Sequence, residues 1–445
     1  MISGDTIAAI ATAPGRGGVA IVRVSGPEAF AIAEWLTGCA VAPARVQFAR
    51  LRGLKSSVSR PAPEDGRQKT EDVIDEGILL AFESPHSYTG EDVVEFQCHG
   101  GSVTPRRVLE ACLAAGARLA RRGEFTERAF LNGKLDYDQA ESVLDLVDAK
   151  TSRAADAALE GLSGRRRRAL RTLYETALDL SARLEHALDI DEGELPDDFL
   201  PTVMSSVFRL KSSLCEAVRR SAEGRLLKSG ALVVLAGPPN AGKSSLMNAL
   251  LETNRAIVSD VPGTTRDSIE EWVDLAGWPI RLTDTAGLRE TKDEVEGEGV
   301  RRAEELLSKA DLVLWLGDPS SVSRLSSSVL PLHPKCDLGR GEGLNVSART
   351  GEGLEELKRA IVAKLEEKVG RTDSGEAPEG DVVALQEALA LLGGGRETRD
   401  MRREEELVLL ANSVRAAAER LGTAVGATYS ADMLDNLFSR FCVGK

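Results

Sequence analysis

The sequence lacks long apolar runs and an excess of basic residues. No apolar stretch approaches the roughly 20 residues that span a bilayer, so we expect no membrane-spanning segment. The first residues, Met1 to Asp5, show no basic region followed by an apolar core, so we expect no secretory signal. The net charge of −14 gives no general attraction to nucleic acid, and any RNA contact would need a local basic patch.

Cysteine is scarce, and it is scattered along the chain. The 6 cysteines form no CxxC pair, which argues against a zinc ribbon and against a disulfide scaffold. This usage favours a reducing compartment, and we expect a cytoplasmic location.

The length of 445 residues exceeds what one ordinary core fills, so several domains are expected. Residues 1–130 mix short apolar runs with glycine-rich turns, which predicts an α+β domain. Within it we expect helical structure from Val108 to Leu119 and a Pro-rich surface loop over residues 60–76. The apolar runs predict strands at Val19–Val24, Gly77–Phe82 and Asp92–Phe96.

The rest of the chain predicts a helical domain that an α/β domain interrupts. Apolar residues recur at helical spacing over 131–228, with an interruption at Asp189–Pro201. Strands alternate with helices over 229–369, and helical spacing returns over 370–445 after a linker rich in Gly, Asp, Glu and Pro. The predicted fold class is therefore multidomain, with an α+β N-terminal domain, a discontinuous α-helical domain and an inserted α/β P-loop domain.

The strongest motif is Gly237-Pro238-Pro239-Asn240-Ala241-Gly242-Lys243-Ser244, which follows the apolar run Ala231–Ala236 and precedes an expected helix. A strand, a glycine-bounded loop and a helix in this order form the context of a phosphate-binding P-loop. Its backbone N–H groups and the helix N-terminus would hold phosphates. Lys243 would reach the terminal phosphates, and the Ser244 hydroxyl would bind Mg²⁺.

Two downstream segments have the character of nucleotide-sensing loops. Gly263-Thr264-Thr265-Arg266-Asp267 supplies a threonine that can complete the Mg²⁺ shell and sense the γ-phosphate, although an ordinary hydroxyl-rich turn is the alternative. Asp284-Thr285-Ala286-Gly287 ends an expected strand in a carboxylate that can hold Mg²⁺, usually through water. Gly287 leaves room for its backbone N–H to approach the γ-phosphate.

Two further segments favour GTP over ATP. Pro334-Lys335-Cys336-Asp337 resembles the guanine motif Asn-Lys-x-Asp, in which Lys335 would stack over the base and Asp337 would accept from its N1–H and exocyclic amine. Pro334 replaces the asparagine that braces the pocket. We therefore predict weak, roughly micromolar binding, because one lost bracing side chain costs about 1–3 kcal/mol. Asn345-Val346-Ser347-Ala348-Arg349 resembles the Ser-Ala-Lys loop that contacts guanine O6, and Arg349 departs from it.

The residue after the Asp-x-x-Gly segment is Leu288, where Ras-like enzymes place a water-orienting glutamine. Leucine cannot orient water, so either hydrolysis is poor or the catalytic groups come from elsewhere. Positive charge at the β–γ bridge is worth roughly 10³–10⁵ in rate, and a monovalent cation can supply it. Asn240 is suitably located to bind such a cation, and the alternative is that it only forms the turn.

Several runs together resemble the MnmE (TrmE) family of bacterial tRNA-modification GTPases. The resemblance spans the whole chain in order, and it agrees with the inserted-domain layout inferred from periodicity. The C-terminal half contributes the P-loop with Asn240, Gly263–Asp267, Asp284–Glu290 and the terminal Cys442-Val443-Gly444-Lys445. The N-terminal half contributes Pro14–Val19, Arg23–Gly26, Tyr88–Val93, Gln97–Gly101 and Gly123–Lys134.

The resemblance implies potassium-stimulated GTP hydrolysis, in which two GTPase domains dimerise and K⁺ stands where an arginine finger would. It implies Glu296 as the catalytic acid that positions water indirectly, where the sequence alone shows one acid in a solvated run. Lys243 and Cys442 are the other implied catalytic residues. Mg²⁺ would bind Ser244 and Thr265, and K⁺ would bind Asn240, Ser259, Val261 and Thr264. The implied GTP contacts are Asn240, Ala241, Gly242, Lys243, Ser244, Ser245, Ser259, Thr264, Thr265, Asp284, Thr285, Ala286, Gly287, Lys335, Asp337, Ser347 and Ala348.

The N-terminal domain is similar to the folate-binding domains of one-carbon enzymes. The family binds 5-formyl-tetrahydrofolate or a related reduced folate between two protomers, and the matching positions are Arg23, Glu95, Lys134 and Lys445. Glu95 could bond the pterin's donors, and the basic residues suit its acceptors or the glutamate tail. Each of Arg23, Glu95 and Lys134 alone would be a surface charge or a structural pair. The resemblance makes Cys442 a functional thiol near this site, which either attacks a carbon centre or only shapes the site.

The resemblance also implies a homodimer that works with the FAD-dependent partner MnmG (GidA) in a heterotetramer-like complex, away from membranes. Together they install an aminomethyl or carboxymethylaminomethyl group at C5 of the tRNA wobble uridine. The basic run Arg165–Arg168 with Arg171 is a candidate phosphate-backbone contact, with a solvated helix face as the alternative. The alternative function is a regulatory GTP switch without one-carbon chemistry, which would need neither the folate residues nor Cys442.

Overall fold

The computed structural model describes residues 4–53, 73–190, 195–253, 270–284, 296–318, 328–370, 381–393, 403–425, 434 and 437–444. The chain divides into two compact units, one of Met1–Leu144 with Thr428–Lys445 and one of Asp145–Ala427. In these described ranges, no helix has the length and apolar character that crossing a bilayer requires.

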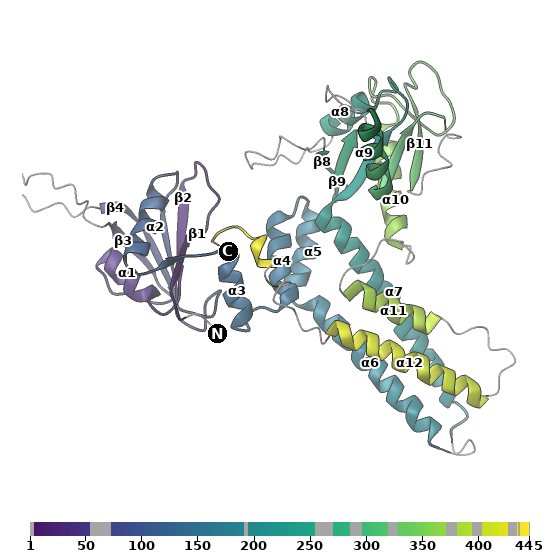
Figure 1. Ribbon diagram of the computed structural model, residues 1–445, viewed down its shortest axis with the longest axis horizontal. Coiled ribbons are helices and arrows are strands. Elements are labelled where there is room, and N and C mark those ends of the chain that lie inside the picture. Colours follow the sequence, from purple (N-terminus) through teal and green to yellow (C-terminus); the bar gives the residue numbers. More distant parts are fainter. Residues whose placement is uncertain are drawn as a thin grey trace, which may run out of the picture. The chain divides into compact units, whose positions relative to one another are not determined.

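The first unit contains a sheet in the order β3-β4-β5-β2-β1-β6, in which only the pair of β1 and β6 is parallel. Alternating burial in β2 and β5 places Val22, Val24 and Phe96 on the face that α1 (Ala29–Thr37) and α2 (Thr104–Ala114) cover (Figure 1). The strands are β1 (Ile7–Ile10), β2 (Val19–Ser25), β3 (Val46–Arg52), β4 (Val73–Phe82), β5 (Val93–His99) and β6 (Arg118–Leu119).

The other face of this sheet carries the residues that alternate with these buried ones along each strand. The register of β2 and β5 sets Arg23 directly across from Glu95. Phe48 on the edge strand β3 is 73% exposed. Polar and apolar side chains therefore share a sheet face that α1 and α2 do not cover.

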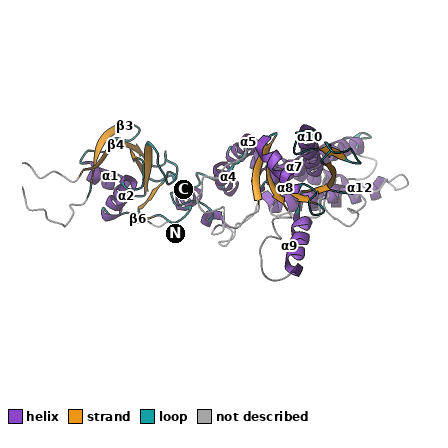
Figure 2. Ribbon diagram, turned by 90° about the horizontal axis from the view of Figure 1, so that it is seen from above, coloured by secondary structure: helices purple, strands orange, loops and turns teal. Residues whose placement is uncertain are grey.

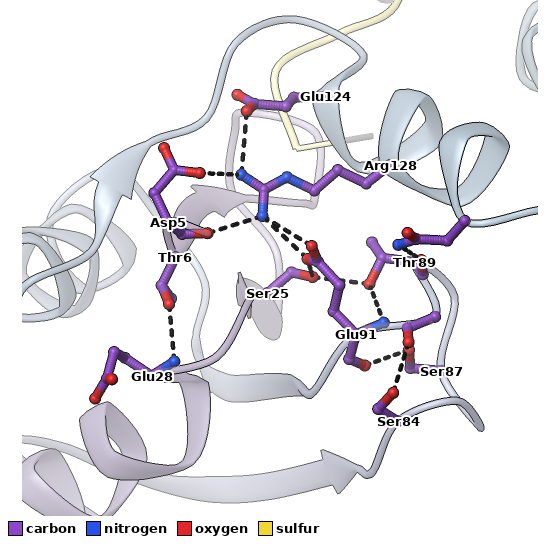
Figure 3. Close-up of polar contacts among 12 residues, drawn as sticks. Asp5, Thr6, Ser25, Glu28, Ser84, Ser87, Thr89, Glu91, Glu124 and Arg128 are labelled. Carbon is purple, nitrogen blue, oxygen red and sulfur yellow. Dashed lines mark hydrogen bonds and ion pairs between the residues drawn. The ribbon is translucent and has the colours of Figure 1, made fainter. Parts of the chain in front are cut away.

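Helix α3 (Glu124–Leu131) is fixed to the sheet by a buried ion network. The Arg128 guanidinium lies within hydrogen-bond distance of Asp5, Glu91 and Glu124, which come from three separate segments (Figure 3). Downstream of α4 (Tyr137–Asp148), the last residues of the chain return to this unit, where Val443 pairs with Arg122. Their apolar side chains pack on α4 in a cluster of Ala140, Leu144, Leu437, Phe438 and Phe441.

The second unit contains a helical part that two stretches of chain build together. Leu173, Leu180 and Leu184 recur at spacings of seven and four residues, which place them on one helix face, and they share one core with α7, α11 and α12. Helix α12 packs on α6, and α11 packs on α7 and α12. The helices are α5 (Ser152–Leu162), α6 (Arg165–Leu188), α7 (Phe199–Ser229), α11 (Asp381–Gly393) and α12 (Arg403–Val425).

Between α7 and α11 the chain forms an α/β part, in which α8, α9 and α10 lie around a sheet (Figure 2). The strand order is β12-β11-β10-β7-β9-β8, parallel except for the pair of β8 and β9. Leu232 and Val234 of the central strand face α9, whereas Val233 and Leu235 share a core with α8 and α10. The elements are β7 (Ala231–Ala236), α8 (Lys243–Thr253), β8 (Glu270–Leu275), β9 (Trp278–Asp284), α9 (Glu296–Lys309), β10 (Leu312–Leu316), β11 (Val329–Pro334), β12 (Leu344–Val346) and α10 (Leu354–Gly370).

This architecture confirms the predicted fold class, and the four predicted domain ranges stay predictions. The expected helix from Val108 to Leu119 is wrong at its end, because α2 stops at Ala114 and Gly116, at φ +114°, turns the chain into β6. The expected loop over 60–76 is wrong at 73–76, which belong to β4; residues 54–72 lie outside the described part. The interruption predicted up to Pro201 is too long, since α7 begins at Phe199 and a proline in a first helical turn forgoes no hydrogen bond.

Candidate functional site

The P-loop connects the central strand β7 to α8. Every residue of β7 is buried, and α8 begins at Lys243. Gly237 has φ +146°, and a Cβ there would lie 2.3 Å from the Leu316 carbonyl oxygen, so only glycine fits. Asn240 also takes a left-handed backbone conformation, at φ +59°. The loop therefore departs from regular structure at two positions before α8, and a loop of this kind at a helix N-terminus is suited to bind an anion.

Lys243 and Ser244 stand at the start of α8, where the sequence predicts them. Lys243 is 7% exposed, and its ammonium donates to the carbonyl oxygens of Gly237 and Pro238 at 3.0 Å each. The Ser244 hydroxyl donates to Asp284 Oδ2 at 2.6 Å. Asp284 ends β9, which pairs with β7, so the two neighbouring strands bring these groups together. A serine hydroxyl and an aspartate are oxygen ligands of the kind that Mg²⁺ prefers.

The guanine segment meets the P-loop through Lys335. Its ammonium donates to the Asn240 carbonyl oxygen at 2.9 Å. The buried Ser347 hydroxyl donates to Asp337 Oδ1 at 2.7 Å, and Arg349 lies 3.2 Å from Oδ2. The Ser347 hydrogen bond, with the charges of Arg349 and Lys335, holds the pKa of Asp337 below its ordinary value. Asp337 is therefore an oriented carboxylate, the group that can accept from two adjacent N–H donors.

A cavity of about 550 Å³ lies beside both segments. Pro238 and Ala241 line it from the P-loop, and Pro334 and Lys335 line it from the guanine segment. Pro334 ends β11 and offers no side-chain amide to this cavity.

Part of the predicted nucleotide site lies outside the described residues. Of Glu296, the first residue of α9, the structure describes the backbone only. Ala241, Gly242 and Ser245 lie in or next to the P-loop, and Ala348 follows Ser347. The predicted residues outside the described part are Ser259, Val261, Thr264, Thr265, Thr285, Ala286, Gly287 and Lys445.

The predicted folate residues Arg23 and Glu95 form an ion pair, with Arg23 Nε 2.8 Å from Glu95 Oε1. The Arg23 guanidinium also lies over the rings of Tyr88 and Phe125, at 5.7 and 5.5 Å from their centroids. Its Nη1 donates to the Gly444 carbonyl oxygen at 3.3 Å. Arg23 is therefore held by the sheet, by two aromatic rings and by the C-terminal tail. Tyr88 and Phe125 are not among the predicted site residues, although both lie in runs that carry the resemblance.

Lys134 and Cys442 lie in the same unit as Arg23. The Lys134 ammonium donates to the Pro85 carbonyl oxygen at 3.0 Å and makes no described contact with the Arg23–Glu95 pair. Cys442 is exposed, and its carbonyl oxygen accepts from Gly123 N–H at 3.4 Å. The tail that carries Cys442 is thus attached at the start of α3.

The basic run occupies the first two turns of α6. No acidic residue accompanies it in the first turn, where the helix dipole favours negative charge. Arg165 and Arg171 are 71% and 70% exposed, and Arg171 pairs with Glu175 at 2.8 Å. Arg165 lies 3.8 Å from Glu160, so both of these arginines have an acidic partner while their side chains remain accessible.

Two family models match the chain: the GTP-binding protein TrmE N-terminus over residues 6–134, and the MnmE helical domain over residues 138–442. A tRNA modification GTPase MnmE from Symbiobacterium thermophilum is 41% identical over 475 residues, which cover 99% of each chain. One from Heliobacterium modesticaldum is 40% identical over 486 residues, 99% of this chain and 100% of the relative. Among solved structures, the G domain of the T. maritima FeoB iron transporter is similar at 30% identity, over 30% of this chain and 98% of that one, with a TM-score of 0.23.

Proposed function

This chain belongs to the MnmE family of tRNA modification GTPases, and on that premise we propose that it hydrolyses GTP to drive tRNA modification. One arrangement carries the proposal: the Ser244–Asp284 contact stands at the phosphate end of a P-loop, and Ser347 orients Asp337 at its base end. The two ends of a guanine nucleotide thus have matching groups in one α/β part.

At the phosphate end, Lys243 would exchange its loop carbonyls for the terminal phosphates. Ser244 and Thr265 would hold Mg²⁺, with Asp284 bonded through water. The metal would neutralise charge on the phosphates. At the base end, Asp337 would accept from the guanine N1–H and amine, while Lys335 holds the base segment to the P-loop.

For catalysis we place K⁺ on Asn240, with Ser259, Val261 and Thr264, and the attacking water under the control of Glu296. The Asn240 carbonyl oxygen already accepts from Lys335, so its side-chain oxygen is the group left for a cation. Leu288 cannot orient water, so we assign the rate enhancement to a cation at the β–γ bridge and not to a side chain at that position.

The test is steady-state GTP hydrolysis in K⁺ buffer and in matched Na⁺ buffer, with ATP as the control substrate. Strong K⁺ stimulation with GTP alone, lost in Asn240→Ala, supports the proposal. A hydrolysis rate that is the same in K⁺ and Na⁺ buffer would remove the support for Asn240 as a K⁺ ligand and for the role of Glu296. Equal hydrolysis of ATP and GTP would remove the support for Asp337 as the residue that recognises guanine.

On the first unit we propose a reduced folate site, for 5-formyl-tetrahydrofolate or a relative, formed by Arg23, Glu95, Lys134 and Lys445. The Arg23–Glu95 pair, on the sheet face opposite α1 and α2, supports it, since a pterin presents both donors and acceptors. Cys442 would act beside this ligand, because its tail bonds Arg23 through Gly444.

Calorimetric titration with 5-formyl-tetrahydrofolate tests this site. Arg23→Met and Glu95→Gln should each weaken binding, whereas Arg50→Met should not. Arg50 is the matched control, because it forms an ion pair of the same type with Glu76 on the same sheet, at 2.6 Å. Wild-type affinity in Arg23→Met would contradict the assignment.

The remaining proposals concern assembly and product. We propose a cytoplasmic homodimer that joins the FAD-dependent MnmG and modifies C5 of the tRNA wobble uridine with an aminomethyl or carboxymethylaminomethyl group. Light scattering of the chain with and without MnmG tests the assembly. Nucleoside analysis of tRNA from cells that lack the chain tests the product, and an unchanged wobble uridine would favour the regulatory switch instead.

A further inference from the structure

Arg349 pairs with the carboxylate that is proposed to read guanine. Its Nη2 lies 3.2 Å from Asp337 Oδ2, while the Ser347 hydroxyl donates to Oδ1 at 2.7 Å. Ser347 is fully buried, whereas the Arg349 side chain is 78% exposed. The buried Ser347 hydroxyl thus binds Oδ1 of Asp337, and the exposed Arg349 guanidinium binds Oδ2.

Asp337 is accessible only through a small part of its surface. Its side chain is 12% exposed, and its segment is fixed by Cys336 N–H, which donates to the Val346 carbonyl oxygen at 3.1 Å. The exposed cation sits on the oxygen that the buried hydroxyl leaves open. A base that donates two N–H groups to this carboxylate must approach through the same opening, so the base and Arg349 compete for it.

The other nearby cation does not share this role. The Lys335 ammonium is 2.9 Å from the Asn240 carbonyl oxygen and so binds the P-loop. Among the described residues, Arg349 is the only cation within ion-pair distance of Asp337. Arg349 is therefore the described cation whose ion pair with Asp337 the base must replace.

We propose that Arg349 sets the affinity for guanine by capping Asp337 in the nucleotide-free state and leaving it when the base binds. This inference rests on the proposed function, because it takes Asp337 as the base-reading residue. Each binding event then gives up one ion pair whose cation is exposed to solvent, which corresponds to about two- to fivefold in affinity. A cation that stacked on the base or bonded a phosphate would instead favour binding, so the two roles have opposite signs.

The test measures the dissociation constant of fluorescent mant-GDP for the full chain and for Arg349→Ala at about 0.1 M salt. Arg349→Ala should bind about two- to fivefold more tightly, and the gain should shrink at about 1 M salt, where the wild-type pair is screened. The matched control is Arg340→Ala, which removes a similarly exposed guanidinium from Glu352, 2.6 Å away, and should bind as wild type does. Unchanged or weaker binding by Arg349→Ala overturns the inference.

The Asp337→Asn variant tests whether Arg349 affects binding through its ion pair with Asp337. In Asp337→Asn the ion pair cannot form, and the amide presents one donor and one acceptor, which match xanthine. Arg349→Ala should then leave mant-XDP affinity unchanged, and a gain there would overturn the inference. Wild-type protein that fails to prefer mant-GDP over mant-ADP would overturn the proposed function. A wild-type preference with no gain in Arg349→Ala would overturn this inference alone.

Discussion

Arg128→Met should destabilise the first unit by about 3–5 kcal/mol, the usual consequence of removing one partner from a buried ion pair. The Arg128 side chain is 5% exposed. Its Nη2 lies 2.8 Å from Asp5 Oδ1, and its Nη1 lies 3.0 Å from Glu91 Oε2 (Figure 3). Methionine keeps an unbranched apolar stem but removes the charge.

The size of this loss in stability depends on which hydrogen-bond and ion-pair partners each carboxylate keeps when Arg128 is replaced. Glu124, whose side chain is 2% exposed, retains the Arg118 guanidinium at 2.6 Å. Asp5 is 39% exposed and can be hydrated. Glu91 is 14% exposed and retains the Ser25 hydroxyl at 2.7 Å, but it loses its ion pair with Arg128. The cost therefore falls mainly on one carboxylate, which places the expected loss near the lower end, about 3 kcal/mol.

Hydrogen exchange of peptides from β1, β2 and β5 is the suitable assay, because a chain of several domains does not unfold in one transition. The matched control is Arg50→Met in the same unit. Its pair with Glu76 is shorter, at 2.6 Å, but the two side chains are 68% and 47% exposed, so the loss should stay below about 1 kcal/mol. Equal losses in the two variants would refute the argument that burial, rather than distance, sets the value of these pairs.

Three further predictions concern nucleotide binding and pH. Ser244→Ala should weaken Mg²⁺-dependent GTP binding by about tenfold or more, because it removes the hydroxyl that contacts Asp284 and is proposed to bind Mg²⁺. Titration of GTP binding with Mg²⁺ measures this effect, and an unchanged Mg²⁺ requirement would contradict it. Pro334→Asn should tighten GTP binding by at least about fivefold if a bracing amide recovers 1 kcal/mol or more, which mant-GTP titration measures; equal affinities would contradict it. Burial raises the pKa of Glu124, but hydrogen bonds from Arg118 and Arg121 outweigh it and leave the pKa lowered. A lowered folded pKa means that the first unit loses stability as pH falls below the ordinary glutamate value of about 4.3, and constant exchange protection down to about pH 3 would contradict this.

The sequence predicts the nucleotide side of the fold well because its signals are local. The run Ala231–Ala236 and the glycines of the P-loop lie next to each other, and each fixes its own backbone. The short strand β6 shows the opposite case. Arg118 and Leu119 continue a helical spacing, but they pair with Ile7 and Ala8 more than a hundred residues earlier. A hydrophobic pattern within a short stretch of sequence cannot predict a pairing with such a distant strand.

The candidate site divides in the same way. Asp337 and Ser347 are ten residues apart, and the motif that contains them predicts their contact. The Arg349–Asp337 pair is nearly as close in sequence, at twelve residues, but spacing does not predict it, because an exposed arginine has many rotamers. Arg23 and Glu95 are 72 residues apart, and the register of β2 and β5 alone makes them partners.

The C-terminal segment shows how tertiary packing assembles the predicted folate residues. Its helical spacing continues that of the helical part, yet Phe438 and Phe441 bury against α4 in the first unit. An amphipathic pattern specifies an apolar face, but it does not specify which of several apolar surfaces will cover that face. Here the choice brings the Gly444 carbonyl oxygen to the Arg23 guanidinium. The tail that carries Cys442 thus lies beside the Arg23–Glu95 pair, and the packing of Phe438 and Phe441 on α4 holds it there. The chemistry proposed for the Cys442 thiol depends on that packing.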